Sequence, residues 1–276
     1  MVAMSRSRLL WPLLAGLTAA STVCLLLGFG WAVKDMLYPA MAEVGPELAT
    51  KPETDEALPL EEATEIRIVA FGDSLTKGTG DTTGEGYVKL AAAGLRDKLG
   101  KPVRIINNLA INGMLTRELS EKLELGSGYR QAIKGANLIL FTIGGNDLFQ
   151  SARAANQGRP LSALQIAGMA SALTETMDGF GKVVQTIGSI NPDATILYIG
   201  LYNPFYDVEQ LRSGSLEVQQ WNTNAYAILH KYPKMMMVPT FDLFEWQIGK
   251  RLSEDHFHPN HEGYKRIAER IVSALE

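Results

Sequence analysis

From Ile66 to the C-terminus, short apolar runs alternate with segments whose apolar residues recur every three or four positions. The runs predict strands, and the periodic segments predict helices. The predicted strands are Ile66–Phe71, Val103–Asn107, Leu138–Ile143, Thr195–Gly200 and Met235–Thr240. The predicted helices are Tyr87–Leu99, Leu115–Leu123, Leu161–Ile190, Leu216–His230 and Glu262–Leu275. Strands separated by helices predict a five-stranded parallel sheet covered on both faces, a three-layer α/β/α sandwich.

A second apolar pattern lies near the N-terminus, where residues 9–33 form an uncharged run of 25 residues. A helix needs about 20 residues to cross a bilayer, and a cleavable signal peptide has a shorter apolar core. We therefore predict that residues 1–39 are a retained, single-pass membrane anchor. Arg6 and Arg8 precede the run, so the positive-inside rule places the rest of the chain outside the cytoplasm. The alternative is secretion after cleavage near Ala42, in the peptidase-like sequence Ala40-Met-Ala42.

Composition changes between this run and the first strand. Residues 40–65 hold eight acidic residues and one lysine, with three prolines and few large apolar side chains. Such a segment cannot build a core, so we predict an extended tether between the anchor and a catalytic domain of residues 66–276. Subtracting the tether's charge of −7 and the anchor's +2 from the net charge of −4 leaves +1 for residues 66–276. Without a clustered basic face, this domain is not predicted to bind nucleic acid.

The first strand ends on Gly72-Asp73-Ser74, a polar turn after an apolar run. Parallel sheets carry their chemistry beyond the carboxyl ends of the strands. A serine there can also open a helix, whose unpaired N–H groups and dipole favour an oxyanion. We predict that Ser74 is a nucleophile. The alternative is that Ser74 only caps the following helix.

A base for this serine is available before the last predicted helix. Asp255 and His258 lie three residues apart in a polar turn. The carboxylate can accept a bond from the imidazole Nδ1–H, which leaves Nε2 free to take the serine proton. Serine needs such a base because its hydroxyl is a poor nucleophile at its own pKa. We predict that Ser74, His258 and Asp255 form a catalytic triad.

Two further polar segments follow the second and third strands, so they are expected at the same sheet edge as Ser74. One runs from Asn108 to Gly113, and the other is Gly144-Gly-Asn146-Asp147. Gly113 can offer an unobstructed backbone N–H, and Asn146 can offer a side-chain amide. Together with the Ser74 N–H, these groups form a predicted oxyanion hole.

Four motifs in this order resemble the GDSL or SGNH hydrolase family: Gly72-Asp73-Ser74-Leu75, Asn108 to Gly113, Gly144-Gly145-Asn146-Asp147 and Asp255-x-x-His258-Pro259. The resemblance covers nearly all of residues 66–276 and implies a flavodoxin-like sandwich and a serine esterase without a cofactor. It makes Ser74, Gly113, Asn146 and His258 the four name-giving positions, with Asp255 completing the triad. Ala110 departs from the pattern, because many members have glycine there, and we expect this to affect the shape of the loop.

The substrate range implied by the resemblance runs from lipids to thioesters and acetylated sugars. The predicted anchor, and aromatic residues in segments 149–160 and 202–206, favour a lipid or another apolar acyl ester. A carbohydrate O-deacetylase acting on cell-wall sugars is the alternative within the family. A non-catalytic ligand-binding module and a membrane scaffold are alternatives of other classes, but the presence of every triad residue favours an enzyme.

Two remaining motifs could suggest other ligands. The glycine-rich loop 78–86 lacks the Lys-Ser/Thr ending of a phosphate-binding loop, so we predict a flexible loop beside Ser74 instead. His256, His258 and His261 could provide three metal ligands, but no second ligand cluster accompanies them. We predict no metal. Cys24 is the only cysteine, which excludes a disulfide within the chain.

Overall fold

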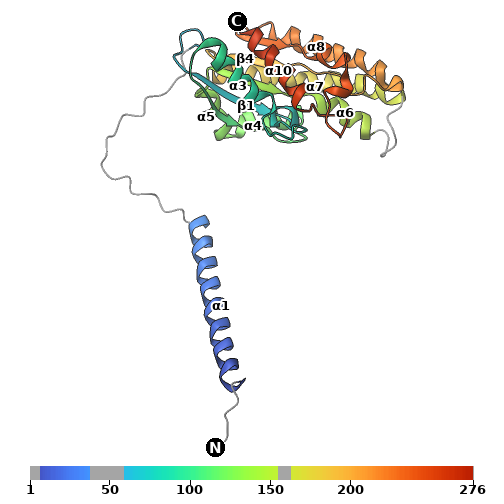
Figure 1. Ribbon diagram of the computed structural model, residues 1–276. Coiled ribbons are helices and arrows are strands. Elements are labelled where there is room, and N and C mark those ends of the chain that lie inside the picture. The colour runs from blue at the N-terminus through green and yellow to red at the C-terminus, as the bar shows by residue number, and fades with distance from the viewer. Residues whose placement is uncertain (1–6, 38–58, 155–162, 276) are drawn as a thin grey trace, which may run out of the picture. The chain divides into compact units, whose positions relative to one another are not determined.

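The computed structural model describes residues 7–37, 59–154 and 163–275, and the chain divides into two compact units at residues 53 and 54 (Figure 1). The described part of the first unit is one helix, α1 (Ser7–Leu37), which includes the predicted apolar run. Within the described ranges, no helix has the combination of length and hydropathy that a membrane span requires. The anchor of residues 1–39 and its orientation stay predictions. Most of the predicted tether, residues 40–58, lies outside the described residues.

The second unit is built on a sheet of five parallel strands in the order β2-β1-β3-β4-β5. The strands are β1 (Ile66–Gly72), β2 (Val103–Asn108), β3 (Leu138–Thr142), β4 (Thr195–Ile199) and β5 (Met235–Val238). All five strands were predicted, and each ends within two residues of the predicted position. This order is that of flavodoxin-like folds, in which β1 and β3 flank the point where the chain reverses direction across the sheet.

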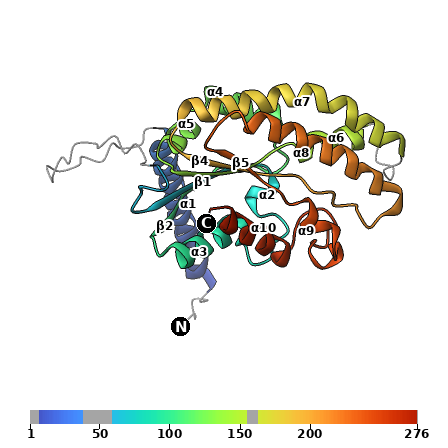
Figure 2. The ribbon, with the colours of Figure 1, turned by 90° about the horizontal axis from the view of Figure 1, so that it is seen from above.

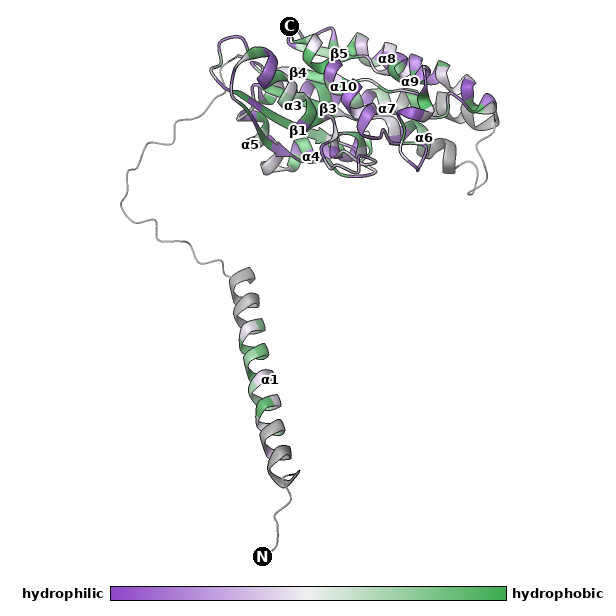
Figure 3. Cartoon of the chain, in the orientation of Figure 1, coloured by the Kyte–Doolittle hydropathy of each residue, from purple (hydrophilic) through white to green (hydrophobic). Residues whose placement is uncertain are grey.

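Burial explains why the strands are apolar runs without alternation. Every residue of β3 and β4 is buried, and so is β1 except for Arg67. Figure 3 shows these central strands in the green of hydrophobic residues. The edge strands β2 and β5 are only partly buried. Central strands of a parallel sheet carry helices on both faces, and each side chain therefore meets a core.

Figure 2 shows the helices of the second unit in two layers, one on each side of the sheet. One core contains residues of α4 (Thr116–Leu125), α5 (Ser127–Lys134), α6 (Gly145–Ala154), α7 (Ala163–Ile190) and α8 (Ser215–Leu229). The opposite core contains residues of α3 (Gly86–Leu99), α9 (Phe241–Glu245) and α10 (His261–Ala274). The predicted three-layer α/β/α sandwich is therefore confirmed. Shorter helical segments are α2 (Ser74–Lys77), η1 (Glu209–Gly214) and η2 (Ile248–Lys250).

The pairing of α3 with α10 brings the end of the chain back beside its first strand. Tyr87 and Tyr264 face each other with ring centroids 6.4 Å apart. Gly94 leaves room for Val272, whose Cγ2 would lie only 2.8 Å from a Cβ at position 94. The helix predicted at Glu262–Leu275 forms as α10, and its apolar residues Ile267 and Ile271 are fully buried in this core. The turn preceding α10 is thereby held next to α2.

Candidate active site

Ser74 is the first residue of α2, immediately after the carboxyl end of β1. Gly72 has φ +122°, and a Cβ there would lie 1.8 Å from the carbonyl oxygen of Thr142 on β3. Only glycine permits this close approach. Asp73 caps the helix, because its Oδ1 accepts bonds from Leu75 N at 3.1 Å and Thr142 Oγ1 at 2.6 Å. The capping role considered for Ser74 therefore belongs to Asp73.

Ser74, His258 and Asp255 form one hydrogen-bonded chain. His258 Nε2 lies 2.8 Å from Ser74 Oγ, and His258 Nδ1 lies 2.5 Å from Asp255 Oδ2. A carboxylate at Nδ1 requires that the ring proton be on Nδ1, which leaves Nε2 to accept the proton of the serine hydroxyl. The geometry is that of a nucleophile, a base and the group that orients the base.

Asp255 is held in place by its own turn. Its Oδ1 accepts bonds from Ser253 Oγ at 2.7 Å and from the backbone N–H groups of Phe257 and His258 at 2.9 Å each. Partial burial acts to raise the pKa of Asp255, but the bonds from His258, Ser253 and Phe257 outweigh it and hold the pKa well below its ordinary value. The carboxylate of Asp255 is therefore ionised at neutral pH.

The predicted oxyanion donors meet Ser74 in one cleft of about 360 Å³. Gly113 lies in the turn after β2 with φ +77°, and the space around its Cα is open. Asn146 lies in the first turn of α6 and donates from Nδ2 to Met114 O at 3.1 Å. An amide nitrogen has two hydrogens, so this bond leaves a second donor. The cleft is also lined by Thr79, Asn112, Phe149, Asp255, Phe257 and His258.

The other polar residues of the motifs hold the loops at this edge together. Asn108 donates from Nδ2 to Thr76 O at 2.8 Å, which ties the end of β2 to α2. Asp147 accepts bonds from Thr116 N and Thr116 Oγ1, which ties α6 to α4. These bonds fix the segments that carry Ser74 and Asn146, and the motif residues beside the triad therefore support its geometry.

An apolar recess adjoins Ser74 on the side of β4. Phe149 contacts Phe205 and Phe257 edge to face, with centroid distances of 5.8 and 5.4 Å. Phe257 in turn contacts the ring of His258 at 5.0 Å. The recess is also lined by Leu75, Leu201, Tyr202 and Pro204. The expected aromatic rim at residues 202–206 therefore lies beside the nucleophile, whereas residues 155–160 of the other rim segment lie outside the described residues.

Each of the three clustered histidines faces a different aspartate. His256 Nε2 lies 3.1 Å from Asp207, and His261 Nδ1 lies 3.3 Å from Asp81. Among the residues that the structure describes, no cluster of three histidine, cysteine or acidic side chains has a metal-binding arrangement. Asp81 and Asp207 could not be predicted as partners of these histidines, because nothing in a loop sequence indicates a partner so distant in the chain.

A serine, a histidine and an aspartate linked in this way at the carboxyl edge of a parallel sheet are the arrangement of a serine hydrolase. Residues 70–266 match the model of the GDSL-like Lipase/Acylhydrolase family. The chain therefore belongs to that family, as the ordered motifs indicated.

Curated relatives and solved structures match about three quarters of the chain. The uncharacterized protein YpmR of Bacillus subtilis (strain 168) is 36% identical over 76% of this chain and 82% of its own. The spore germination lipase LipC of Bacillus licheniformis is 25% identical over 76% and 96%. The lipase Lip_vut3 from a goat rumen metagenome has a TM-score of 0.66 at 24% identity, covering 76% and 97%. A family 3 carbohydrate esterase of Clostridium thermocellum has a TM-score of 0.55 at 17% identity, covering 76% and 98%.

Proposed function

We propose that this protein is a serine esterase that cleaves carboxylic esters through an acyl-enzyme on Ser74. The observation that carries the proposal is the bond of 2.8 Å between His258 Nε2 and Ser74 Oγ. His258 takes the hydroxyl proton as Ser74 attacks the ester carbonyl, and it returns that proton to the departing alcohol. Asp255 stabilises the imidazolium that forms between these two steps.

The tetrahedral intermediate carries a negative charge on the former carbonyl oxygen. In the proposed mechanism, the N–H groups of Ser74 and Gly113 and the amide of Asn146 donate to this oxygen. Ser74 N–H also lies at the start of a helix, where the backbone favours negative charge. Water activated by His258 then attacks the acyl-enzyme, releases the acid and restores Ser74. None of these steps uses a metal or a cofactor.

We propose a lipid-derived or other apolar acyl ester as the substrate. The apolar lining of the recess beside Ser74 supports this class, since Leu75, Phe149 and Leu201 offer no hydrogen bonds to a sugar. The recess has a volume of about 20 Å³, so it holds only the first atoms of an acyl group, and the rest of a longer chain would lie in the open cleft. The name of the relative LipC, a spore germination lipase, agrees with it. The alternative is O-deacetylation of a carbohydrate, in which the small acetyl group would occupy the recess and the sugar would lie in the open cleft.

A membrane location for the enzyme is a separate proposal, based on the apolar run at residues 9–33 and the arginines before it. We expect the full-length protein in the membrane fraction after carbonate washing, and the catalytic domain accessible to protease on the outer side of the membrane. Recovery of a chain that begins near residue 43 from the medium would instead support cleavage after Ala42.

The esterase proposal is tested by hydrolysis of p-nitrophenyl acetate, butyrate, octanoate and palmitate by the full-length chain and its Ser74→Ala variant. We expect hydrolysis that the variant loses without loss of folding. Preference for octanoate or palmitate supports an apolar acyl ester, whereas activity confined to acetate supports a deacetylase. Equal rates for both proteins on all four esters, without fluorophosphonate labelling of Ser74, would make the protein a binding module.

A further inference from the structure

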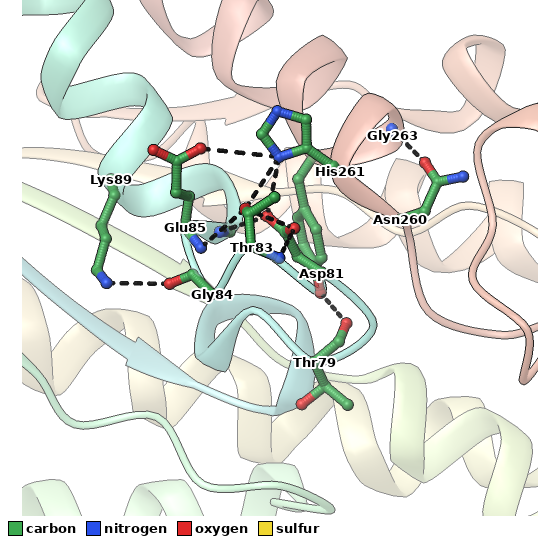
Figure 4. Close-up of polar contacts among 11 residues, drawn as sticks. Thr79, Asp81, Thr83, Gly84, Glu85, Lys89, Asn260, His261 and Gly263 are labelled. Carbon is green, nitrogen blue, oxygen red and sulfur yellow. Dashed lines mark hydrogen bonds and ion pairs between the residues drawn. The ribbon is translucent and has the colours of Figure 1, made fainter.

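Loop 78–86 joins α2, which carries Ser74, to α3, and it is built around one buried carboxylate. The side chain of Asp81 is fully buried. Its Oδ1 accepts from Thr83 N at 2.9 Å and Thr83 Oγ1 at 2.7 Å, and its Oδ2 accepts from Gly86 N at 2.9 Å (Figure 4). Gly78 and Gly86 lie against each other at the base of the loop. The loop predicted to be flexible is therefore held together by internal hydrogen bonds to Asp81.

This loop touches the two segments that carry the nucleophile and the base. Thr79 N donates to Ser74 O at 3.0 Å. At Gly80, with φ +94°, an added Cβ would lie 2.8 Å from His258 Cβ and 2.6 Å from Pro259 O, so the loop backbone rests directly on the base and its neighbour. Loop 78–86 is thus a short physical connection between Ser74 and His258, which lie 184 residues apart in sequence.

His261 joins loop 78–86 to α10. It is the first residue of α10, and its Nδ1 lies 3.3 Å from Asp81 Oδ2 and 3.1 Å from Thr83 Oγ1. The Thr83 hydroxyl already donates to Asp81, so the proton between Thr83 and the imidazole comes from Nδ1. Glu85 Oε2, at 3.8 Å, adds a second negative charge near the ring. Figure 4 shows this ring directed from α10 towards the centre of the loop.

We propose that Asp81 and His261 are positioning residues that set the distance between His258 and Ser74 for the esterase reaction. The inference rests on the proposed function. The bond fixes the first residue of α10, three residues after His258, to a loop that is itself bonded to Ser74. Tyr264 Oη also donates to Thr79 O at 2.6 Å, so α10 stays attached to the loop without this bond, but Pro259 and His258, in the turn before α10, gain freedom to shift relative to Gly80. Such movement lengthens the contact between Nε2 and Ser74 Oγ, and small displacements of reacting groups slow reactions strongly.

Two substitutions of His261 separate the hydrogen bond from the bulk of the side chain. Asparagine places its Nδ2 donor where the imidazole has Nδ1, whereas alanine has no donor. In the full-length protein, we expect His261→Ala to lower kcat for p-nitrophenyl acetate by at least about 10-fold with KM within about twofold. His261→Asn is expected to keep kcat within about threefold of the wild type. His230→Ala, on the exposed end of α8, is the matched control and should change neither constant.

An NMR measurement reports the contact between His258 Nε2 and Ser74 Oγ in the absence of substrate. The ¹⁵N shift of His258 Nε2 senses the bond from Ser74 Oγ, so Ser74→Ala gives the value for a broken bond. We expect His261→Ala to move this shift towards that value, and His261→Asn to leave it at the wild-type value. Thermal melting of each variant confirms that the folded protein is observed.

The two measurements separate failure of this inference from failure of the proposed function. If hydrolysis depends on Ser74 but His261→Ala and His261→Asn behave alike, whether both are active or both are impaired, Asp81 and His261 are not a positioning pair. If the ¹⁵N shifts follow the expected pattern while the wild type is no faster than Ser74→Ala, the pair stands and the esterase proposal fails.

Discussion

The indole of Trp221 packs against the backbone of Gly144 so closely that no side chain fits between them. A Cβ at position 144 would lie 2.0 Å from the ring, and Gly144 has φ +107°. Trp221 Nε1 donates to Tyr198 Oη at 2.7 Å, and Tyr198 Oη donates to Ile143 O at 2.9 Å. This contact holds the start of α6, and with it Asn146, against the hydrophobic core that covers one face of the sheet.

We expect Gly144→Ala to lower the free energy of unfolding by about 3 kcal/mol. The added methyl group must displace a fully buried indole, and the alanine must keep a φ that is unfavourable for residues other than glycine. Urea unfolding followed by tryptophan fluorescence measures the change. Gly181→Ala, in α7, is the control. No atom lies within 4 Å of a Cβ there, so this variant should gain up to about 1 kcal/mol from helix propensity. Equal stability of the Gly144 variant and the wild type would contradict the contact.

Asn146→Ala tests the amide that is proposed to hold the oxyanion. We expect kcat to fall by about 10²- to 10³-fold with little change in KM, since the bond is made in the transition state. Asn112→Ala is the matched control. Asn112 lines the same cleft, but its Oδ1 accepts from Thr79 Oγ1 at the surface. A control variant as slow as Asn146→Ala would show that any loss of an amide in the cleft is damaging.

The pH dependence of kcat/KM tests the roles of Asp255 and His258. The pKa of Asp255 is well below its ordinary value because the bonds from His258, Ser253 and Phe257 outweigh partial burial. Asp255 therefore stays ionised at acidic pH, and its protonation should add no second step to the acid limb of the kcat/KM profile. In Asp255→Asn, we expect kcat to fall by about 10⁴-fold. A second step on the acid limb of the wild type, in the ordinary range of a carboxyl group, would argue against the pairing in solution.

The ionised carboxylate of Asp73 is expected to destabilise the folded protein at neutral pH. Burial raises the pKa of Asp73 above its ordinary value of 3.8, although bonds from Thr142 and Leu75 and the charge of His258 oppose the shift. A raised pKa in the folded state gives stability that is complete below the unfolded value and is lost as pH rises through the folded value. Asparagine keeps a capping oxygen and has no charge.

Asp73→Asn should therefore raise the urea midpoint at about pH 7.5 and leave it almost unchanged at about pH 3, below the ordinary value, where the wild-type carboxyl is protonated in both the folded and the unfolded state. Asp242→Asn, which removes an exposed carboxylate paired with Arg270, provides the comparison for a surface charge. A midpoint for Asp73→Asn that is lower than that of the wild type at both pH values would mean that the charge itself stabilises the cap.

The sheet could be predicted because its strands have a clear hydrophobic pattern in the sequence. The runs at 66–71 and 138–143 are apolar without interruption, since both faces of these strands are buried. The long helix α7 was predicted from its periodicity. Helices α5, α6 and α9 were not predicted. Helix α9 has only five residues, and α5 and α6 start at Ser127 and Gly145, in sequences typical of turns.

The site was predictable to the extent that its residues follow strand ends. Ser74, Gly113 and Asn146 could be assigned to one edge of the sheet by that rule alone, and the turn from Asp255 to His258 by its spacing. The partnership of Asp81 with His261 had no such signal. The two residues lie 180 positions apart, and only the packing of α10 on α3 brings them together.

The packing of α10 against α3 also decides when the nucleophile acquires its base. Ser74 and the first three strands leave the ribosome well before residues 255–275, which are needed to complete the fold of the domain. A partly made chain can therefore present the serine but has neither the imidazole nor the helix that holds it. On the proposed mechanism, the nascent chain is inert towards the esters it meets during synthesis, and hydrolysis begins only when its last helix has docked.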